Sequence, residues 1–148
     1  MNLEPNSVLV KEVSWVEMGK EIASIRRRVF VEEQGVPPEL EWDGQDEYAF
    51  HVLAFSNGQA LATGRLLPNG HLGRMAVLRE LRGRGIGSQV LQTLLALARR
   101  EKIGPIFLHA QLSARSFYMK YGFRACGEIF GEAGIAHIRM ELTPLDKS

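Results

Sequence analysis

The stretch RGRGIGSQ at residues 82–89 constrains the fold of this chain more than any other segment. Its glycines are Gly83, Gly85 and Gly87, and they stand directly before a run with helical spacing of apolar residues. Glycine allows positive φ and lets the main chain approach a ligand without a Cβ in the way. The N-terminus of a helix presents N–H groups at the positive end of its dipole. The stretch therefore predicts an anion site, with Arg82 and Arg84 adding charge at its rim.

Two common phosphate-binding loops do not fit this spacing. A P-loop needs Gly-Lys-Ser/Thr, and no lysine lies between Glu80 and Glu101. A dinucleotide fingerprint needs a third glycine where Ser88 stands, and the strand before it follows a hairpin instead of opening a βαβ unit. A glycine-rich turn that only leads into a helix stays open as the alternative.

Length and composition favour one domain over residues 1–148. The chain is 45% hydrophobic, which is enough for a core, and its net charge of +1 argues against a general polyanion binder, so no nucleic-acid partner is expected. Cys126 is the single cysteine, which excludes an intramolecular disulfide. With no signal-like N-terminus and no apolar run long enough to span a bilayer, we expect a cytoplasmic protein without a membrane partner.

Periodicity predicts a sequence of strands and helices in the first half. Strands are expected at 7–14, 49–56, 59–68 and 71–78, and a helix from Glu17 to Val31. Asn57-Gly58 predicts a hairpin between the second and third strands. The acidic stretch 39–47 reads as a solvated loop, and the arginines at 26–28 as a solvated helix face. If they lie beside a substrate, the acidic stretch would favour a cationic acceptor and the arginines an acidic one.

The second half adds two helices and three strands. A helix begins at Ile86 and ends before Gly104-Pro105, and a buried strand follows at 106–111. A short helix at 113–123, with Ser113 as N-cap and Gly122 as its stop, precedes strands at 125–131 and 136–142. A strand–helix–strand unit inside an otherwise antiparallel sheet predicts an α+β domain.

The segment MAVLRELRGRGIGSQVLQTLLALA, residues 75–98, resembles the signature of the GNAT N-acetyltransferases. That signature reads Arg/Gln-x-x-Gly-x-Gly/Ala, and Arg82, Gly85 and Gly87 match it. The resemblance implies that the loop binds the pyrophosphate of acetyl-CoA, the co-substrate, and that the preceding strand contacts its pantetheine arm. The residues implied are Met75, Ala76 and Val77 for the arm, and Arg82, Gly83, Arg84, Gly85, Ile86, Gly87 and Ser88 for the phosphates.

A second segment, AQLSARSFYMKYGF at residues 110–123, looks like the family's A-x-x-F-Y-x-x-x-G-F motif. Together with residues 30–51 and 128–142, it is similar to the ElaA-like and YjcF-like bacterial members. The resemblance implies a mixed, mostly antiparallel central sheet of about six to seven strands flanked by about four helices. One position departs from it: many members carry asparagine six or seven residues before the tyrosine, where this chain has Leu112 and Gln111.

Acetyl transfer needs a neutral amine, and an amine with a pKa of about 10.4 is only about 0.04% neutral at pH 7. Recovering the neutral form corresponds to about 4.6 kcal/mol, so a base or a water chain is expected. The resemblance places Tyr118 near the sulfur of acetyl-CoA, where a phenol can protonate the leaving thiolate. An amphipathic core tyrosine is the alternative reading.

Glu33 and His137 are the first candidates for the base. The resemblance implies that Glu33 lies in the region that lines the acceptor groove, and a solvated carboxylate is the alternative. His137 follows the final turn, where it points either into the acceptor site or to the other face of the sheet. The other carboxylates and histidines weighed are His51, His109, Glu128 and Glu132, and both His51 and His109 fit structural histidines inside strands. The four histidines show none of the short spacings of zinc sites, so no metal is expected.

These patterns together predict an enzyme that transfers the acetyl group of acetyl-CoA directly to a primary amine in a ternary complex. The acceptor is a small amine or an amine of a peptide or protein. The alternatives are a non-catalytic acyl-CoA-binding module and a structural interaction domain. An exposed edge of the final hairpin makes a homodimer possible.

Overall fold

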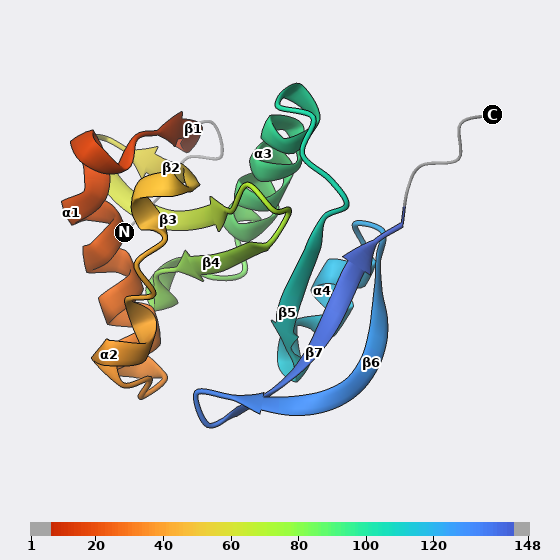
Figure 1. Cartoon of the computed structure of the whole chain (residues 1–148). Coiled ribbons are helices and arrows are strands. Elements are labelled where there is room, and N and C mark those ends of the chain that lie inside the picture. Colours follow the sequence, from red (N-terminus) through yellow and green to blue (C-terminus); the bar gives the residue numbers. More distant parts are fainter. Residues whose placement is uncertain (1–6, 144–148) are drawn as a thin grey trace.

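The computed structural model describes residues 7–143, which form two antiparallel sheets with helices packed around them (Figure 1). In the first sheet the order is β1 (Leu9–Val13), β2 (Phe50–Ser56), β3 (Gln59–Leu66) and β4 (Leu72–Val77). In the second it is β5 (Phe107–Gln111), β7 (Ile135–Leu142) and β6 (Phe123–Glu132). The α-helices are α1 (Trp15–Arg26), α2 (Pro38–Glu41), α3 (Ile86–Arg100) and α4 (Arg115–Met119). The predicted α+β class is confirmed.

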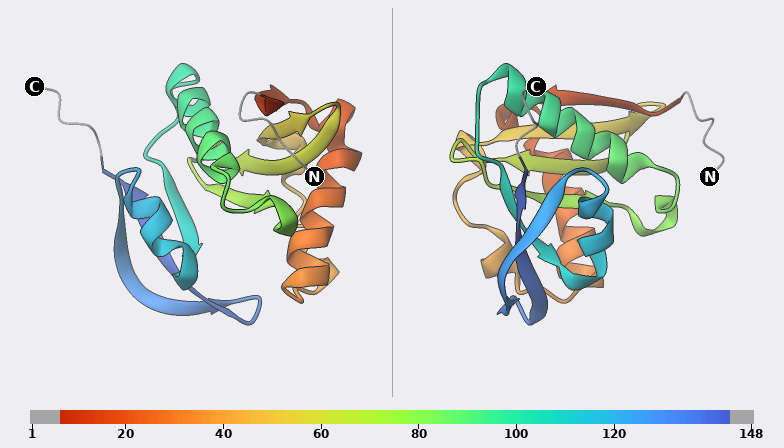
Figure 2. Two further views of the ribbon diagram at one scale, coloured as in Figure 1. Left: turned by 180° about the vertical axis from the view of Figure 1, so that it is seen from behind. Right: turned by 90° about the vertical axis from the view of Figure 1, so that its right-hand side faces the viewer.

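The expected central sheet is divided between β4 and β5. One isolated parallel bridge pairs His71 with Phe107, and the Phe107 N–H donates to Gly70 O at 3.0 Å. Away from this joint the two sheets diverge, as Figure 2 shows. β4 is therefore an edge strand of its sheet, with β3 on one side only.

Helix α3 packs directly against the first sheet at Gly64. A Cβ on Gly64 would lie 2.7 Å from Leu94 Cδ1 and 2.9 Å from Val90 Cγ1, and both of those side chains are fully buried. Real Cβ atoms are essentially never found at such distances from a neighbour, so a side chain at this position would force these two side chains, or the helix that carries them, to shift. The glycine therefore sets how closely α3, and the loop before it, approaches β3.

The predicted turn at Asn57-Gly58 is confirmed, with φ of 52° and 76° at its two residues. The first helix is longer than predicted at both ends. It starts at Trp15, where Ser14 Oγ accepts from the Glu17 N–H at 3.1 Å, and continues as a π-helical segment over Arg27–Glu33. Ser113 is not a cap, because it lies in a 3₁₀ turn and α4 begins two residues later. Within residues 7–143, no helix is long and apolar enough to cross a membrane.

The prediction of a solvated acidic stretch is wrong for Glu41 and Asp46, which are 3% and 5% exposed. It is also wrong for Arg26, which is 0% exposed. Arg26 Nε donates to Glu41 Oε1 at 2.7 Å, and its Nη1 donates to Asp46 Oδ1 at 2.6 Å. Buried charges are tolerated when they are paired and hydrogen-bonded. The stretch after α1 therefore folds back over the helix and is not a free loop.

Candidate active site

The glycine loop connects the end of β4 to the start of α3. Gly83 and Gly85 have φ of 79° and 80°, the left-handed region that favours glycine, and Gly85 is the N-cap residue of the helix. A Cβ at either position would have no protein atom within 4 Å among the described residues. These glycines are therefore required by backbone conformation, and the loop leaves its outer surface open to a ligand.

The first turn of α3 supplies backbone N–H groups that can donate hydrogen bonds to an anion at this loop. The Gln89 N–H bonds back to Gly85 O at 3.2 Å, and the N–H groups before it precede the point where helical bonding begins. Those groups belong to Ile86, Gly87 and Ser88. A Cβ on Gly87 would lie 3.6 Å from Val77 Cγ2, so the helix start passes close to the end of β4. The site has the geometry of an anion-binding helix N-terminus.

Arg82 fixes this loop to two other elements. Its Nε donates to Val77 O at 3.0 Å, and its two terminal nitrogens contact Glu33 Oε2 at 2.6 Å and Glu33 Oε1 at 2.7 Å. The hydrogen bonds from Arg82 lower the pKa of Glu33 below its usual value. Arg84 is exposed at the rim of the loop. The structure thus places Glu33 beside the glycine loop.

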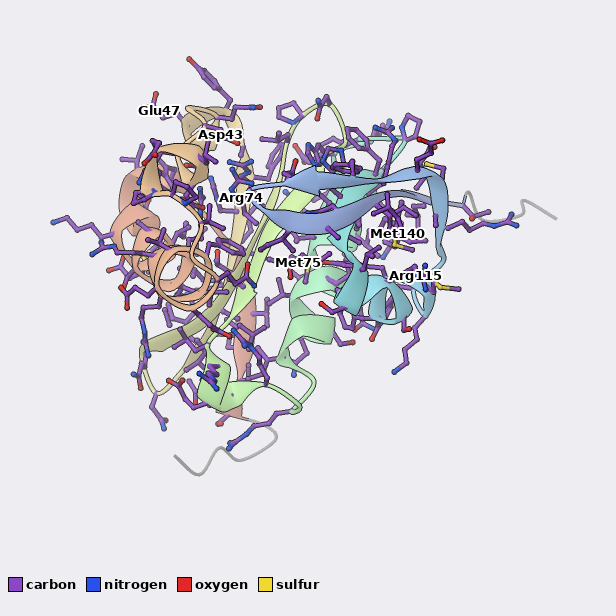
Figure 3. The ribbon with its side chains drawn as sticks, turned by 90° about the horizontal axis from the view of Figure 1, so that it is seen from below. Asp43, Glu47, Arg74, Met75, Arg115 and Met140 are labelled. Carbon is purple, nitrogen blue, oxygen red and sulfur yellow. The ribbon has the colours of Figure 1, made fainter. Side chains whose placement is uncertain are left out.

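A cavity of about 450 Å³ lies between the diverging edges of β4 and β5. Its walls also include α4, the end of the first helix and the tip of the β6–β7 hairpin, and it is in the size range of small-molecule sites. Figure 3 shows Arg74 and Met75 of β4 between the first helix and that hairpin. The polar and charged lining residues are Gln34, Glu41, His71, Arg74, His109, Gln111, Tyr118, Glu132 and His137.

Tyr118 connects α4 to β4 in this cavity. Its hydroxyl lies 3.7 Å from Met75 Sδ, and its ring packs edge-on against Phe117 and Phe123. Burial raises the pKa of Tyr118 to about 12. The phenol is therefore fully protonated at neutral pH and is held in place next to the strand that precedes the glycine loop.

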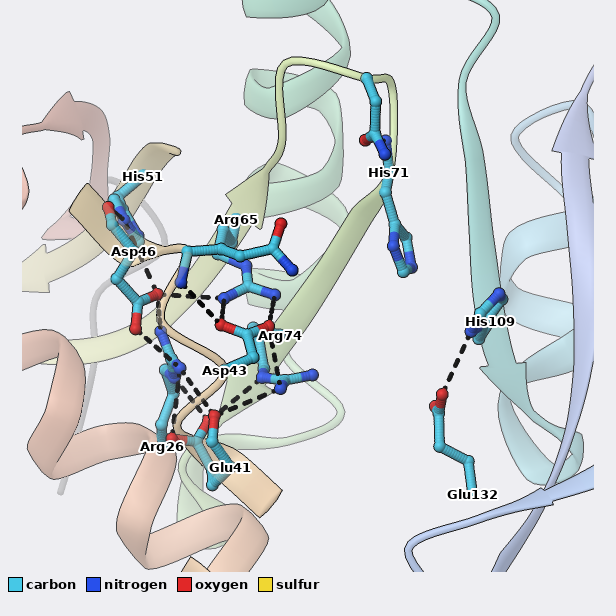
Figure 4. Close-up of polar contacts among 12 residues, drawn as sticks. Arg26, Glu41, Asp43, Asp46, His51, Arg65, His71, Arg74, His109 and Glu132 are labelled. Carbon is cyan, nitrogen blue, oxygen red and sulfur yellow. Dashed lines mark hydrogen bonds and ion pairs between the residues drawn. The ribbon is translucent and has the colours of Figure 1, made fainter. Parts of the chain in front are cut away.

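His137 and Glu132 occupy the opposite wall. His137 Nδ1 lies 2.7 Å from Ile135 O, and because a carbonyl only accepts, this nitrogen carries a hydrogen. The other ring nitrogen, Nε2, lies 3.7 Å from Glu132 Oε2. The second oxygen of Glu132 lies 3.2 Å from His109 Nδ1, a contact drawn in Figure 4. Of the candidates from the sequence, Tyr118, His137, His109 and Glu132 line the cavity, and Glu33 is not among its lining residues.

Two features of the cavity were not found from the sequence. One is Gln111, which stands at one of the two positions where many family members carry asparagine. Its Nε2 donates to Gln34 Oε1 at 2.9 Å. Arg74 is the other, and an arginine inside the strand-like run HLGRMAVL is a sign that a charged group is paired there. His51 is a structural histidine, as expected: it is 0% exposed and its Nε2 lies 2.9 Å from Asp46 O. In residues 7–143, no group of three or more His, Cys, Asp or Glu side chains is arranged to hold a metal ion.

Comparison with known proteins agrees with this geometry. The profile of the acetyltransferase (GNAT) domain matches residues 11–144. The chain is 33% identical to YjcF of Bacillus subtilis, described as an uncharacterized N-acetyltransferase, over 84% of this chain and 91% of YjcF. It is 32% identical to the ElaA protein of Escherichia coli over 80% of this chain and 83% of ElaA.

A solved structure gives the same result. The crystal structure of an acyl-CoA N-acyltransferase from Pseudomonas aeruginosa superposes with a TM-score of 0.83 at 31% identity, covering 93% of this chain and all of that one. Fold, glycine loop and sequence identity all agree: the chain belongs to the GNAT acetyltransferase family and is an acyl-CoA-dependent N-acyltransferase.

Proposed function

We propose that the protein transfers the acetyl group of acetyl-CoA directly to a primary amine while both substrates are bound. One observation carries this proposal: β4 runs from the cavity that holds Tyr118 to the glycine loop at the start of α3. An extended molecule with a phosphate group at one end and a thioester at the other spans the same two places.

The cofactor contacts follow from this path. The N–H groups of residues 83–88 bind the pyrophosphate, and Arg82 holds the loop in place. Because β4 pairs with β3 on one side only, the main chain of Met75, Ala76 and Val77 offers hydrogen bonds to the pantetheine arm.

The chemistry uses groups within the cavity. The amine nitrogen attacks the thioester carbonyl, an N–C bond forms, and the C–S bond breaks as the tetrahedral intermediate collapses. A main-chain N–H of β4 donates to the oxyanion. Tyr118 gives its proton to the departing thiolate, which suits a phenol that is protonated at neutral pH. The proton lost by the amine goes to the base.

His137 and Glu33 are the candidates for that base, and their surroundings differ. His137 lines the cavity, and its Nε2 carries the free lone pair of the neutral ring. Glu33 is bound through both oxygens by Arg82, which lowers its pKa and makes it a weaker proton acceptor. We therefore place His137 first and Glu33 second.

The surroundings of the reaction complete the proposal. The protein acts in the cytoplasm on a small amine or an amine of a peptide or protein. β6 is an edge strand of its sheet, and the exposed side chain of Ile129 lies on it, which supports pairing with a second copy.

Calorimetric titration with acetyl-CoA tests the cofactor site. Wild type is expected to bind, and Gly85→Ala is expected to lose affinity because a side chain is strained at φ of 80°. Gly58→Ala is the matched control, since Gly58 has φ of 76° in open space in the remote β2–β3 turn. Equal loss of affinity in both variants, or no binding by wild type, would contradict the proposal. Binding without release of free thiol in an amine screen would leave only a non-catalytic acyl-CoA-binding module.

A further inference from the structure

Arg74 has an unusual backbone for a residue inside a strand. Its φ is 47°, in the left-handed region, and the pairing of β4 with β3 shifts register at this point, between Thr63 and Arg65. A non-glycine residue in this conformation is uncommon and costs free energy. The bulge directs a long cationic side chain from β4 into the lining of the cavity, next to Met75.

Arg74 belongs to an ion cluster whose members are Arg26, Arg65, Arg74, Glu41, Asp43 and Asp46. It makes the longest contacts of the three arginines. Arg26 and Arg65 make contacts of 2.7 Å to Glu41 and Asp43, and their side chains are 1% and 5% exposed. Arg74 contacts the same two acidic residues only at 3.2 to 3.4 Å and is 27% exposed. The carboxylates of the cluster are thus already satisfied by the other two arginines.

The hydrogen-bond donors of the Arg74 guanidinium are only partly used. Its Nε is buried and makes no hydrogen bond among the described residues, although it lies 3.3 Å from Glu41 Oε1. Its Nη2 is the nitrogen that reaches Glu41 O and Asp43 Oδ2. Figure 4 shows the remaining nitrogen turned away from these carboxylates, toward the side where His109 and Glu132 lie. This terminal nitrogen is the donor of Arg74 that is available to a carboxylate in the cavity, as a charge-assisted hydrogen bond.

The opposite wall suits an ammonium group. When the histidine is neutral with its hydrogen on Nδ1, Glu132 Oε2 and His137 Nε2 are both acceptors, and they lie 3.7 Å apart. A cation between these two atoms would donate to both. The Glu132 side chain is 48% exposed, so a ligand can reach it.

We infer that the acceptor is an amino carboxylate, a small molecule that carries a carboxylate bound by Arg74 and an amine placed at Glu132 and His137. This inference rests on the proposed function and narrows it. It makes Arg74 a binding residue for substrate, in addition to its place in the ion cluster.

Matched acceptor pairs test the inference. Each pair is a free amino acid and its primary amide, and kcat/KM is measured by release of free thiol for wild type, Arg74→Gln and Arg74→Lys. Wild type is expected to prefer the acid. In Arg74→Gln the ratio of kcat/KM for the acid to kcat/KM for the amide should fall about ten- to a hundredfold, since hydrogen bonds between charged groups are among the strongest. Arg74→Lys keeps the cluster charge but loses the fork, so an intermediate preference is expected.

Arg100→Gln is the control, because Arg100 pairs with Glu12 on the surface. The preference of this variant for the acid over the amide should equal that of wild type. Should Arg74→Gln unfold, Arg74→Lys alone still decides. A variant that slows acid and amide equally would overturn the inference and leave Arg74 with a structural role.

Two further outcomes separate this inference from the proposed function. If neutral amines are acetylated and amino acids are not, the function stands and the inference falls. If acetyl-CoA binds but no amine is acetylated, the function falls, and the amino acids are then titrated calorimetrically into protein saturated with CoA. Binding that Arg74→Gln abolishes would support a carboxylate site at Arg74, and absence of binding would overturn it.

Discussion

Arg82 donates hydrogen bonds to both carboxylate oxygens of Glu33, at 2.6 and 2.7 Å, and its Nε donates to Val77 O at 3.0 Å. One side chain thus ties the end of the first helix, the end of β4 and the glycine loop together. Glu33 is therefore in a position to support cofactor binding through Arg82, besides being a candidate base.

Glu33→Gln separates these two roles. If Glu33 positions Arg82, the KM for acetyl-CoA rises about two- to fivefold, the effect of a partly exposed ion pair, and kcat at saturation is unchanged. Steady-state kinetics at varied acetyl-CoA measure both. A fall in kcat with unchanged KM would assign proton transfer to Glu33 and displace His137.

Tyr118→Phe is expected to lower kcat by about a hundredfold and to leave the Kd of acetyl-CoA unchanged, because only proton donation to the thiolate is lost. Turnover and calorimetry on the same preparation measure the two effects. Tyr48→Phe is the control, since Tyr48 is 73% exposed. Because the pKa of Tyr118 is about 12, no fall in the wild-type rate between pH 7 and 10 should come from this residue. Unchanged turnover in Tyr118→Phe would rule it out as the acid.

Stability should fall in two ranges as the pH is lowered. Burial and the neighbouring His109 lower the pKa of His71 from 6.5 to about 4, so the unfolded chain takes up this proton first and stability is lost between those values. The pKa of buried His51 is also lowered and adds to this range. Against the effect of burial, the hydrogen bonds from Arg65 hold the pKa of Asp43 at about 2, below its usual 3.8, so further stability is lost below pH 4.

Urea unfolding of wild type and His71→Gln at a series of pH values measures this. Between pH 6.5 and 4, the unfolding free energy of the variant should change less steeply with pH than that of wild type. Below pH 4 the two proteins should show the same slope. Parallel curves over the whole range would contradict the assignment to His71.

Gly64→Ala should reduce the free energy of unfolding by about 1–3 kcal/mol, because its Cβ overlaps Leu94 and Val90 of α3. Gly131→Ala is the control, since a Cβ on Gly131 meets nothing within 4 Å and should change stability by less than about 0.5 kcal/mol. Denaturant titration distinguishes them, and equal stabilities would show that α3 shifts at no cost.

Cys126→Ser should retain full turnover. Cys126 lies on β6 outside the cavity lining, and its thiol donates to Glu141 Oε1 at 3.1 Å, a contact that raises its pKa. Direct transfer needs no thiol of the enzyme. Loss of activity, or an acetylated Cys126 in mass spectra during turnover, would instead indicate a covalent intermediate.

The parts of the fold that could be predicted are those that depend on short sequence patterns. The Asn57-Gly58 turn depends on two neighbouring residues that tolerate positive φ, and the glycine loop depends on a spacing of a few residues. Helix α3 shows its buried face through apolar periodicity alone. The strands around these signals follow from their composition.

The ion cluster could not be predicted, because its pairs are distant in sequence. Arg26 meets Asp46 twenty residues later, and Arg74 meets Asp43 thirty-one residues earlier. A run of arginines and a run of acids are each typical of solvated surface, and only their meeting in the fold buries Arg26, Glu41 and Asp46. The position of Arg74 in the cavity depends on a bulge that periodicity does not reveal.

The joint at Gly70 and Phe107 has a consequence for how such enzymes diversify. The two sheets meet at that point, while the tip of the β6–β7 hairpin, which lines the cavity, lies in a part of the chain separate from the glycine loop. Insertions at the hairpin tip can therefore reshape the acceptor pocket without disturbing the joint or the loop. The wall of the cavity that the hairpin tip forms can change in evolution while the glycine loop stays the same.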